Sequence, residues 1–160
     1  MSPDGESSNR PSPGEICWVE IPVTDISRAV AFYRAVLDWQ TEDAKPAASV
    51  ITPGPLPGID VVHFFSKGLR LNGAFVKVSD DSSLARVAGP ANIHKRPRLA
   101  YYMVESIDET LGKVESAGGR VHVPKTAISG GSMGFFARFV DSEGNLQAIW
   151  SGQAKELTEH

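Results

Sequence analysis

The sequence has little of what marks secreted, membrane-spanning or nucleic-acid-binding proteins. Its single cysteine, Cys17, excludes an intrachain disulfide and favours the cytoplasm. No apolar run approaches the roughly 18 residues of a membrane span, and residues 1–14, rich in Ser, Pro and Gly, lack the apolar core of a signal peptide. The net charge of -3 supplies no positive field for phosphate backbones or anionic lipid. We therefore expect a cytoplasmic protein with a disordered leader and no nucleic-acid or membrane partner.

The chain does carry enough apolar residues for one folded core. Its 160 residues are 41% hydrophobic and 22% charged, which is typical of a single globular domain. We expect the leader at 1–14, one domain at 15–152 and a tail at 153–160.

The two halves of the chain repeat one pattern. Val23-Thr24-Asp25-Ile26 aligns with Val104-Glu105-Ser106-Ile107 at a shift of 81 positions, and each segment follows an alternating stretch. Asp25 and Ser106 are predicted helix N-caps, and Ser106 with Glu109 has the S-x-x-E form of a capping box. The shift predicts two copies of one supersecondary unit.

An amphipathic helix is predicted after each cap, and Gly118-Gly119 ends the second one. The residues expected to be buried are Ala29, Val30, Tyr33, Val36 and Leu37, then Ile107, Leu111, Val114 and Ala117. Three β-type runs follow each helix, at 39–52, 61–66 and 73–78, then at 120–126, 133–140 and 146–151. The predicted fold class is α+β with the order βαβββ–βαβββ. Module one is expected at 15–78, a linker at 79–97 and module two at 98–152.

Two motifs near the ends of this region resemble those of a known family. The run from Trp18 to Asp25, followed by Arg28-Ala29-Val30-Ala31-Phe32-Tyr33, is similar to the opening "V-x-D…A…FY" of the glyoxalase/bleomycin-resistance/dioxygenase, or vicinal oxygen chelate, superfamily. The run from Phe139 to Asn145 resembles its closing "f-x-D-P-x-G-N" hairpin, with Ser142 in place of the usual proline. The resemblance implies two βαβββ modules that form a curved, incompletely closed sheet of eight strands around a small-molecule cavity. Family members assemble within one chain or by exchanging modules, which leaves a homodimer open.

The resemblance also implies four metal-ligand positions, on the first and last strands of each module. Three of them fall on Trp18, Leu99 and Ala148, and the fourth lies within 73–78 among apolar candidates. Transition metals in such sites need imidazole or carboxylate donors, so we expect no metal and no cofactor. A displaced site built from other donors stays open as an alternative; its candidates are His63, His94, His122 and Glu20.

Strand alternation predicts which side chains face the cavity. On the first strand of module one these are Trp18 and Glu20, and from its middle strands we expect His63 and either Phe64 or Phe65. In module two the inward residues are predicted to be Leu99, Tyr101, Met103, Leu146, Ala148 and Trp150. Arg138 has two readings, as a partner of an anionic ligand or as a surface residue. This lining predicts an apolar, aromatic pocket for a planar organic molecule.

Glu20 and Tyr101 are equivalent positions in the repeat and are expected to approach the same space. A carboxyl group among tryptophans would have a raised pKa, which suits proton transfer to or from a carbon acid near neutral pH. Tyr101 would then hydrogen-bond a substrate carbonyl or enolate. Glu20 could instead bond the backbone or Tyr101 in a purely structural role. The sequence thus favours a metal-independent enzyme that rearranges an aromatic substrate, against a non-catalytic sequestering protein or a metal-dependent lyase or dioxygenase with displaced ligands.

Overall fold

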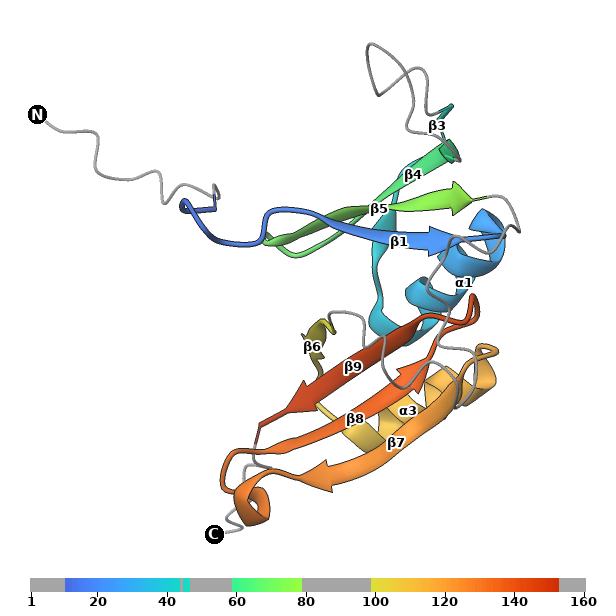
Figure 1. Ribbon diagram of the computed structural model, residues 1–160. Helices are drawn as coiled ribbons and strands as arrows, with labels where there is room; N and C mark the ends of the chain where they lie inside the picture. Colours follow the sequence, from blue (N-terminus) through green and yellow to red (C-terminus); the bar gives the residue numbers. More distant parts are fainter. Residues whose placement is uncertain (1–10, 44, 47–58, 79–98, 153–160) are drawn as a thin grey trace, which may run out of the picture. The chain divides into compact units, whose positions relative to one another are not determined.

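The computed structural model describes residues 11–43, 45–46, 59–78 and 99–152 (Figure 1). The predicted linker and tail, and most of the leader, lie outside the described residues. The chain divides into two compact units, Met1–Ile26 with Asp38–Ser79 and Ser27–Leu37 with Asp80–His160. None of the helices in the part of the chain that the structure describes has the length and hydrophobicity of a membrane-spanning segment.

The first unit is built on one mixed sheet. Its strand order is β1-β5-β4-β2, with β1 parallel to β5 and the other neighbours antiparallel, and a short β3 also pairs with β4. The strands are β1 Val19–Val23, β2 Gln40–Thr41, β3 Lys45–Pro46, β4 Ile59–Lys67 and β5 Leu71–Val78. The single run predicted at 39–52 is thus represented, within the described residues, by two strands of two residues each.

The second unit repeats this topology. Its sheet has the order β6-β9-β8-β7, and β6 is parallel to β9 as β1 is to β5. Its elements are α1 Ile26–Leu37, β6 Tyr101–Met103, α3 Ile107–Ser116, β7 Arg120–Ala127, the short helix η2 Ser129–Gly131, β8 Phe135–Val140 and β9 Leu146–Ser151. In chain order the elements therefore form two βαβββ modules with the same strand order, which confirms the predicted α+β class.

Helix α1 packs within the second unit, although it lies in the first module of the sequence. Its buried residues are Ala29, Phe32, Tyr33, Val36 and Leu37. The prediction chose Val30 instead of Phe32, but Val30 is only half-buried. The ring of Phe32 lies 6.1 Å from that of Phe139 on β8. Contact with the Phe139 ring explains why Phe32 is buried in place of Val30.

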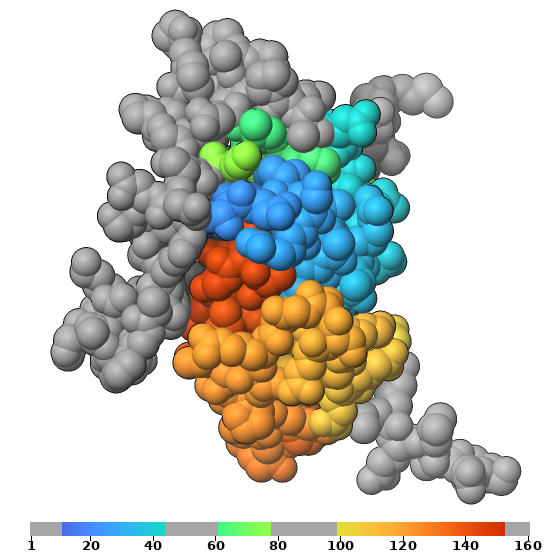
Figure 2. All heavy atoms as spheres, turned by 90° about the vertical axis from the view of Figure 1, so that its right-hand side faces the viewer, coloured from blue at the N-terminus to red at the C-terminus, as the bar shows by residue number. Residues whose placement is uncertain are grey.

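Helix α3 begins and ends as the sequence predicts. The Ser106 hydroxyl accepts the backbone N–H of Glu109 at 3.2 Å, which is half of a capping box. After the helix, Gly118 adopts a positive φ of 94° and the N–H of Gly119 donates to the Val114 carbonyl at 2.9 Å. A Cβ at Gly119 would lie 2.6 Å from the Val140 carbonyl oxygen, so only glycine fits this close approach. Helix α3 and strand β7 then form one continuous surface (Figure 2).

Candidate functional site

The strand register gives the first sheet two distinct faces. Glu20 pairs with Ala74, which pairs with Phe64, so these three side chains share one face. We call this the Glu20 face. Ile21 and Phe75 are paired neighbours on the opposite face, which we call the Ile21 face. The register of β4 with β5 decides which residues of β4 belong to which face, because paired residues share a face and side chains alternate along each strand.

His63 and Phe65 lie on the Ile21 face. The register therefore does not place His63 on the side of the sheet that carries Trp18 and Glu20, whereas Phe65 lines a hollow together with Trp18 all the same. His63 pairs with Phe75, and Phe65 stacks on the Trp39 ring at 4.4 Å. Both residues are buried. The physical reason is strand parity, because a change of one residue in the register moves every side chain to the other face. Phe64 is the aromatic residue of β4 on the Glu20 face.

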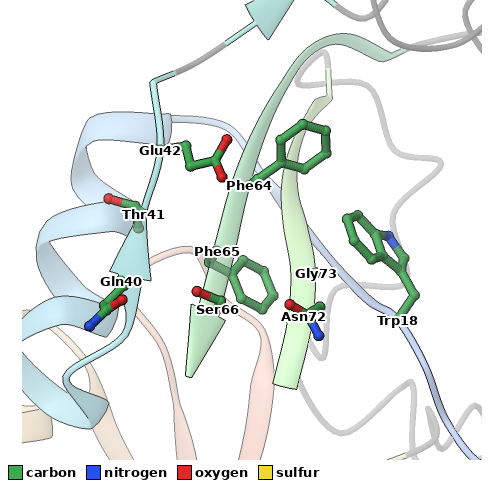
Figure 3. A pocket seen from close by; sticks show the side chains of 9 residues that line it. All are labelled: Trp18, Gln40, Thr41, Glu42, Phe64, Phe65, Ser66, Asn72 and Gly73. Atoms are coloured by element: carbon green, nitrogen blue, oxygen red, sulfur yellow. The ribbon is translucent and has the colours of Figure 1, made fainter. Parts of the chain in front are cut away.

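The Glu20 face of the first unit contains a hollow of about 510 Å³ (Figure 3). Its lining residues are Trp18, Gln40, Thr41, Glu42, Phe64, Phe65, Ser66, Asn72 and Gly73. Trp18 and Phe64 form its aromatic wall, with ring centroids 5.7 Å apart and an interplanar angle of 74°. Such an edge-to-face pair offers ring surface against which a flat ligand can stack.

Polar groups border this aromatic wall. The backbone N–H of Glu42 donates to the Phe64 carbonyl at 3.0 Å, which places Glu42 beside Phe64. Figure 3 shows the Glu42 carboxylate turned toward the Phe64 ring. Ser66 and Asn72 are paired across β4 and β5 at the other end of the hollow. Sequence reasoning missed these polar residues, because no local signal tells which strands become neighbours.

Glu20 shares the face of the hollow without lining it. Its side chain is exposed, so the desolvation on which its predicted chemistry depended is not found there. Trp18 lies two residues earlier and does line the hollow. The catalytic role of Glu20 stays a prediction.

In the second sheet the register brings most of the predicted residues to one face. Tyr101 pairs with Ala148, which pairs with Arg138, and Met103 and Trp150 lie one pleat further along. The Arg138 guanidinium donates to the Tyr101 hydroxyl at 3.1 Å. We call this side the Tyr101 face.

Leu99, just before β6, is half-buried. The indole N–H of Trp150 donates to the Met133 carbonyl at 3.0 Å.

A buried polar cluster lies inside the second unit, where the two family-like motifs meet. The Tyr33 hydroxyl donates to Asp141 at 2.5 Å and accepts from the Gln147 amide at 2.9 Å. Burial, reinforced by the Asp141 charge, raises the pKa of Tyr33 well above its usual value. Burial also raises the pKa of Asp141, against the opposing effect of the hydrogen bonds it accepts. Burial raises the pKa of nearby Tyr102 to about 12.

The residues at the implied ligand positions do not fit a metal. Ala74 is the counterpart of Ala148, because Ala74 pairs with Glu20 and Ala148 pairs with Tyr101, and Glu20 and Tyr101 are equivalent positions in the repeat. The four positions are therefore Trp18, Ala74, Leu99 and Ala148, none of which has a donor group. We derive no chemical step through a metal.

The residues proposed for a displaced site do not gather in the described part of the chain. His63 and Glu20 lie on opposite faces of the first sheet, so they cannot share an ion. His122 is exposed on β7, and His94 lies outside the described residues. Among the described residues, no group of three or more His, Cys, Asp or Glu side chains could hold a metal.

Comparisons with known proteins agree with the fold. The model of a family described as the Glyoxalase/Bleomycin resistance protein/Dioxygenase superfamily matches residues 15–149. The Anthracycline biosynthesis protein DauV from Streptomyces sp. (strain C5) is 27% identical over 142 residues, which are 87% of this chain and 47% of that protein. The chain thus spans about half the length of this curated relative.

Solved structures share the fold at low sequence identity. A glyoxylase/bleomycin resistance protein/dioxygenase domain from Frankia sp. EAN1pec has a TM-score of 0.63 and 14% identity, over 89% of this chain and 100% of that one. The fosfomycin resistance protein FosX from Listeria monocytogenes, in complex with Mn(II) and 1S,2S-dihydroxypropylphosphonic acid, has a TM-score of 0.60 and 15% identity, over 88% of this chain and 91% of that one. These likenesses show the fold alone.

Proposed function

Because the chain belongs to the glyoxalase/bleomycin resistance protein/dioxygenase superfamily, we propose that it binds a small, mainly aromatic organic molecule in the hollow of the first sheet. The observation that carries the proposal is the Trp18–Phe64 pair on the wall of that hollow. A volume of about 510 Å³ lies within the range of small-molecule sites. A planar ring system can stack on this wall and offer its polar edge to Glu42, Ser66 or Asn72.

The relative DauV supports an aromatic ligand, because its name assigns it to anthracycline biosynthesis and an anthracycline is built on fused planar rings. At 27% identity over 47% of that protein, the likeness suggests a ligand class and does not identify a substrate. The Glu42 carboxylate favours a ligand that is neutral or positively charged at this end of the hollow.

We further propose that the protein acts on its ligand by proton transfer without a metal. Glu20 is the predicted proton-transfer group, and Glu42 adds a second carboxylate that lines the hollow itself. A carboxylate at hydrogen-bond distance from an acidic C–H of the ligand could remove that proton. The alternative is a protein that sequesters its ligand unchanged.

Binding is tested with a neutral planar compound, an anthraquinone carboxamide, by isothermal titration calorimetry. Replacing Trp18 by Ala removes half of the aromatic wall and should weaken binding by about 1–3 kcal/mol. The matched control is Leu69→Ala, which also trims an exposed apolar side chain of the first unit but lies outside the hollow. Equal affinities of the wild-type protein and a folded Trp18→Ala variant would refute the proposed site.

Catalysis is tested by incubating anthracycline-type compounds with the protein in D₂O and analysing them by mass spectrometry. A proton-transfer enzyme should exchange or rearrange its substrate, and Glu20→Gln or Glu42→Gln should abolish this while binding is retained. A ligand that is bound tightly but recovered unchanged and unlabelled supports sequestration instead.

A further inference from the structure

Arg138 is a half-buried cation in the middle of the second sheet. It sits on the Tyr101 face of β8, where its guanidinium lies over the Phe136 ring, 5.8 Å from the centroid. This distance permits a cation–π contact. Among the described residues no carboxylate forms an ion pair with Arg138, so its positive charge has no counter-ion there.

One donor of this guanidinium is buried and unused. The Nε atom of Arg138 has no hydrogen-bond partner within the described residues, although the side chain donates from Nη2 to Tyr101. A buried donor without an acceptor is unfavourable unless a water or a ligand supplies one. The contact between Arg138 and Tyr101 therefore leaves one N–H donor of the guanidinium without an acceptor.

Tyr101 is held so that it can act together with Arg138. Its hydroxyl oxygen accepts the N–H of Arg138 at 3.1 Å, which leaves the hydroxyl hydrogen available to donate elsewhere. Its ring contacts Phe136 edge to face, with centroids 6.4 Å apart. Ala148, which is itself buried, lies between Tyr101 and Arg138 in the register, so the two longer side chains meet across its small methyl group.

We propose that Tyr101 and Arg138 together bind the carboxylate of a planar aromatic ligand on the Tyr101 face. The guanidinium supplies charge and N–H donors, and the Tyr101 hydroxyl supplies one more donor to the same group. The ring of such a ligand contacts apolar neighbours on this face, Phe136 and Met103. The inference concerns the second unit alone and goes beyond the hollow of the first sheet.

The test compares two planar probes that differ only in charge, anthraquinone carboxylate and anthraquinone carboxamide, by isothermal titration calorimetry. Arg138→Met should weaken binding of the carboxylate about tenfold or more, because it removes a charge-assisted hydrogen bond. Its effect on the carboxamide should stay within about twofold. Tyr101→Phe should weaken carboxylate binding several-fold. Arg120→Met, the same change of charge at an exposed position of this sheet, should leave both affinities unchanged.

The outcomes separate this inference from the proposed function. If the wild-type protein does not bind the carboxylate, or if folded Arg138→Met binds it as well as the wild type does, the anion site is overturned. If Arg138→Met weakens both probes equally, Arg138 only supports the packing of Tyr101 and the inference fails. The hollow of the first sheet is tested by the dependence of carboxamide binding on Trp18, so either idea can fail while the other stands.

Discussion

The Tyr33 hydroxyl donates a hydrogen bond of 2.5 Å to Asp141, and the bond joins α1 to the end of β8 across 108 residues of sequence. The other oxygen of Asp141 accepts the backbone N–H groups of Glu143 and Asn145, each at 2.8 Å, and so fixes the turn into β9. These contacts explain why a tyrosine stands in the first family-like motif and an aspartate in the closing one. The tyrosine of "FY" and the aspartate of the closing hairpin are partners in one buried cluster.

Tyr33→Phe should destabilise the protein by about 1–3 kcal/mol, because it leaves a buried carboxylate without its hydroxyl donor. Urea unfolding followed by circular dichroism measures the change. The control is Tyr101→Phe, which removes a hydroxyl from a side chain that is 48% exposed and should have little effect on stability. Equal unfolding midpoints for Tyr33→Phe and the wild type would contradict a stabilising role for the bond.

Stability should fall as the pH rises above about 10, the ordinary pKa of a tyrosine in the unfolded chain. Folding raises the pKa of Tyr33 well above that value and the pKa of Tyr102 to about 12. The folded protein therefore keeps protons that the unfolded chain releases, so the stabilisation is complete below pH 10 and is lost through the folded pKa values. Unfolding midpoints across this range measure the effect. Stability should decline less steeply with pH in Tyr102→Phe than in the wild type. An equally steep decline in that variant would argue against a raised pKa of Tyr102 in the folded protein.

The tryptophans of the first unit should differ sharply in their effect on stability. Trp39 is 2% exposed and stacks on Phe65, so Trp39→Ala should cost about 3–5 kcal/mol through the cavity it leaves. Trp18 is 44% exposed and its loss should alter ligand affinity much more than stability. Thermal unfolding of the two alanine variants, side by side, tests this division. Similar losses of stability in both would place Trp18 in the core.

Gly73→Ala should disrupt the pairing of β1 with β5. A Cβ at Gly73 would lie 2.1 Å from the Val19 carbonyl oxygen and 2.4 Å from the Phe65 ring, so the backbone has to move. We expect a loss of about 2 kcal/mol or more. Gly112→Ala in α3 is the matched control, since its Cβ meets open space and alanine favours a helix by up to about 1 kcal/mol. In chemical denaturation, the unfolding midpoint should fall below that of the wild type for Gly73→Ala and rise above it for Gly112→Ala.

The purified protein should hold no stoichiometric transition metal. The expectation depends on the side chains at the four implied positions, Trp18, Ala74, Leu99 and Ala148. Elemental analysis of protein purified without an affinity tag measures the metal content. One metal ion per chain that survives mild chelation would show that other donors have taken over this role.

The sequence by itself determined the local structure and the repeat. The spacing of apolar residues, the Ser106 cap and the glycine stop after α3 act over a few residues, so each could be recognised without knowing the fold. Alternation along β1 likewise assigned Trp18 and Glu20 to one face and Ile21 to the other, because side chains on a strand alternate with a period of two.

Only the tertiary structure decided how distant strands align. The face of β4 depends on its register with β5, which is why Phe64, and neither His63 nor Phe65, shares the Glu20 face. The polar residues of the hollow could not be predicted from the sequence for the same reason, since Glu42 meets Phe64 only through pairing between segments that are far apart in sequence. Hydrogen bonds between strands form over long sequence separations, and the register is set by the packing of all the side chains together, which no local pattern records.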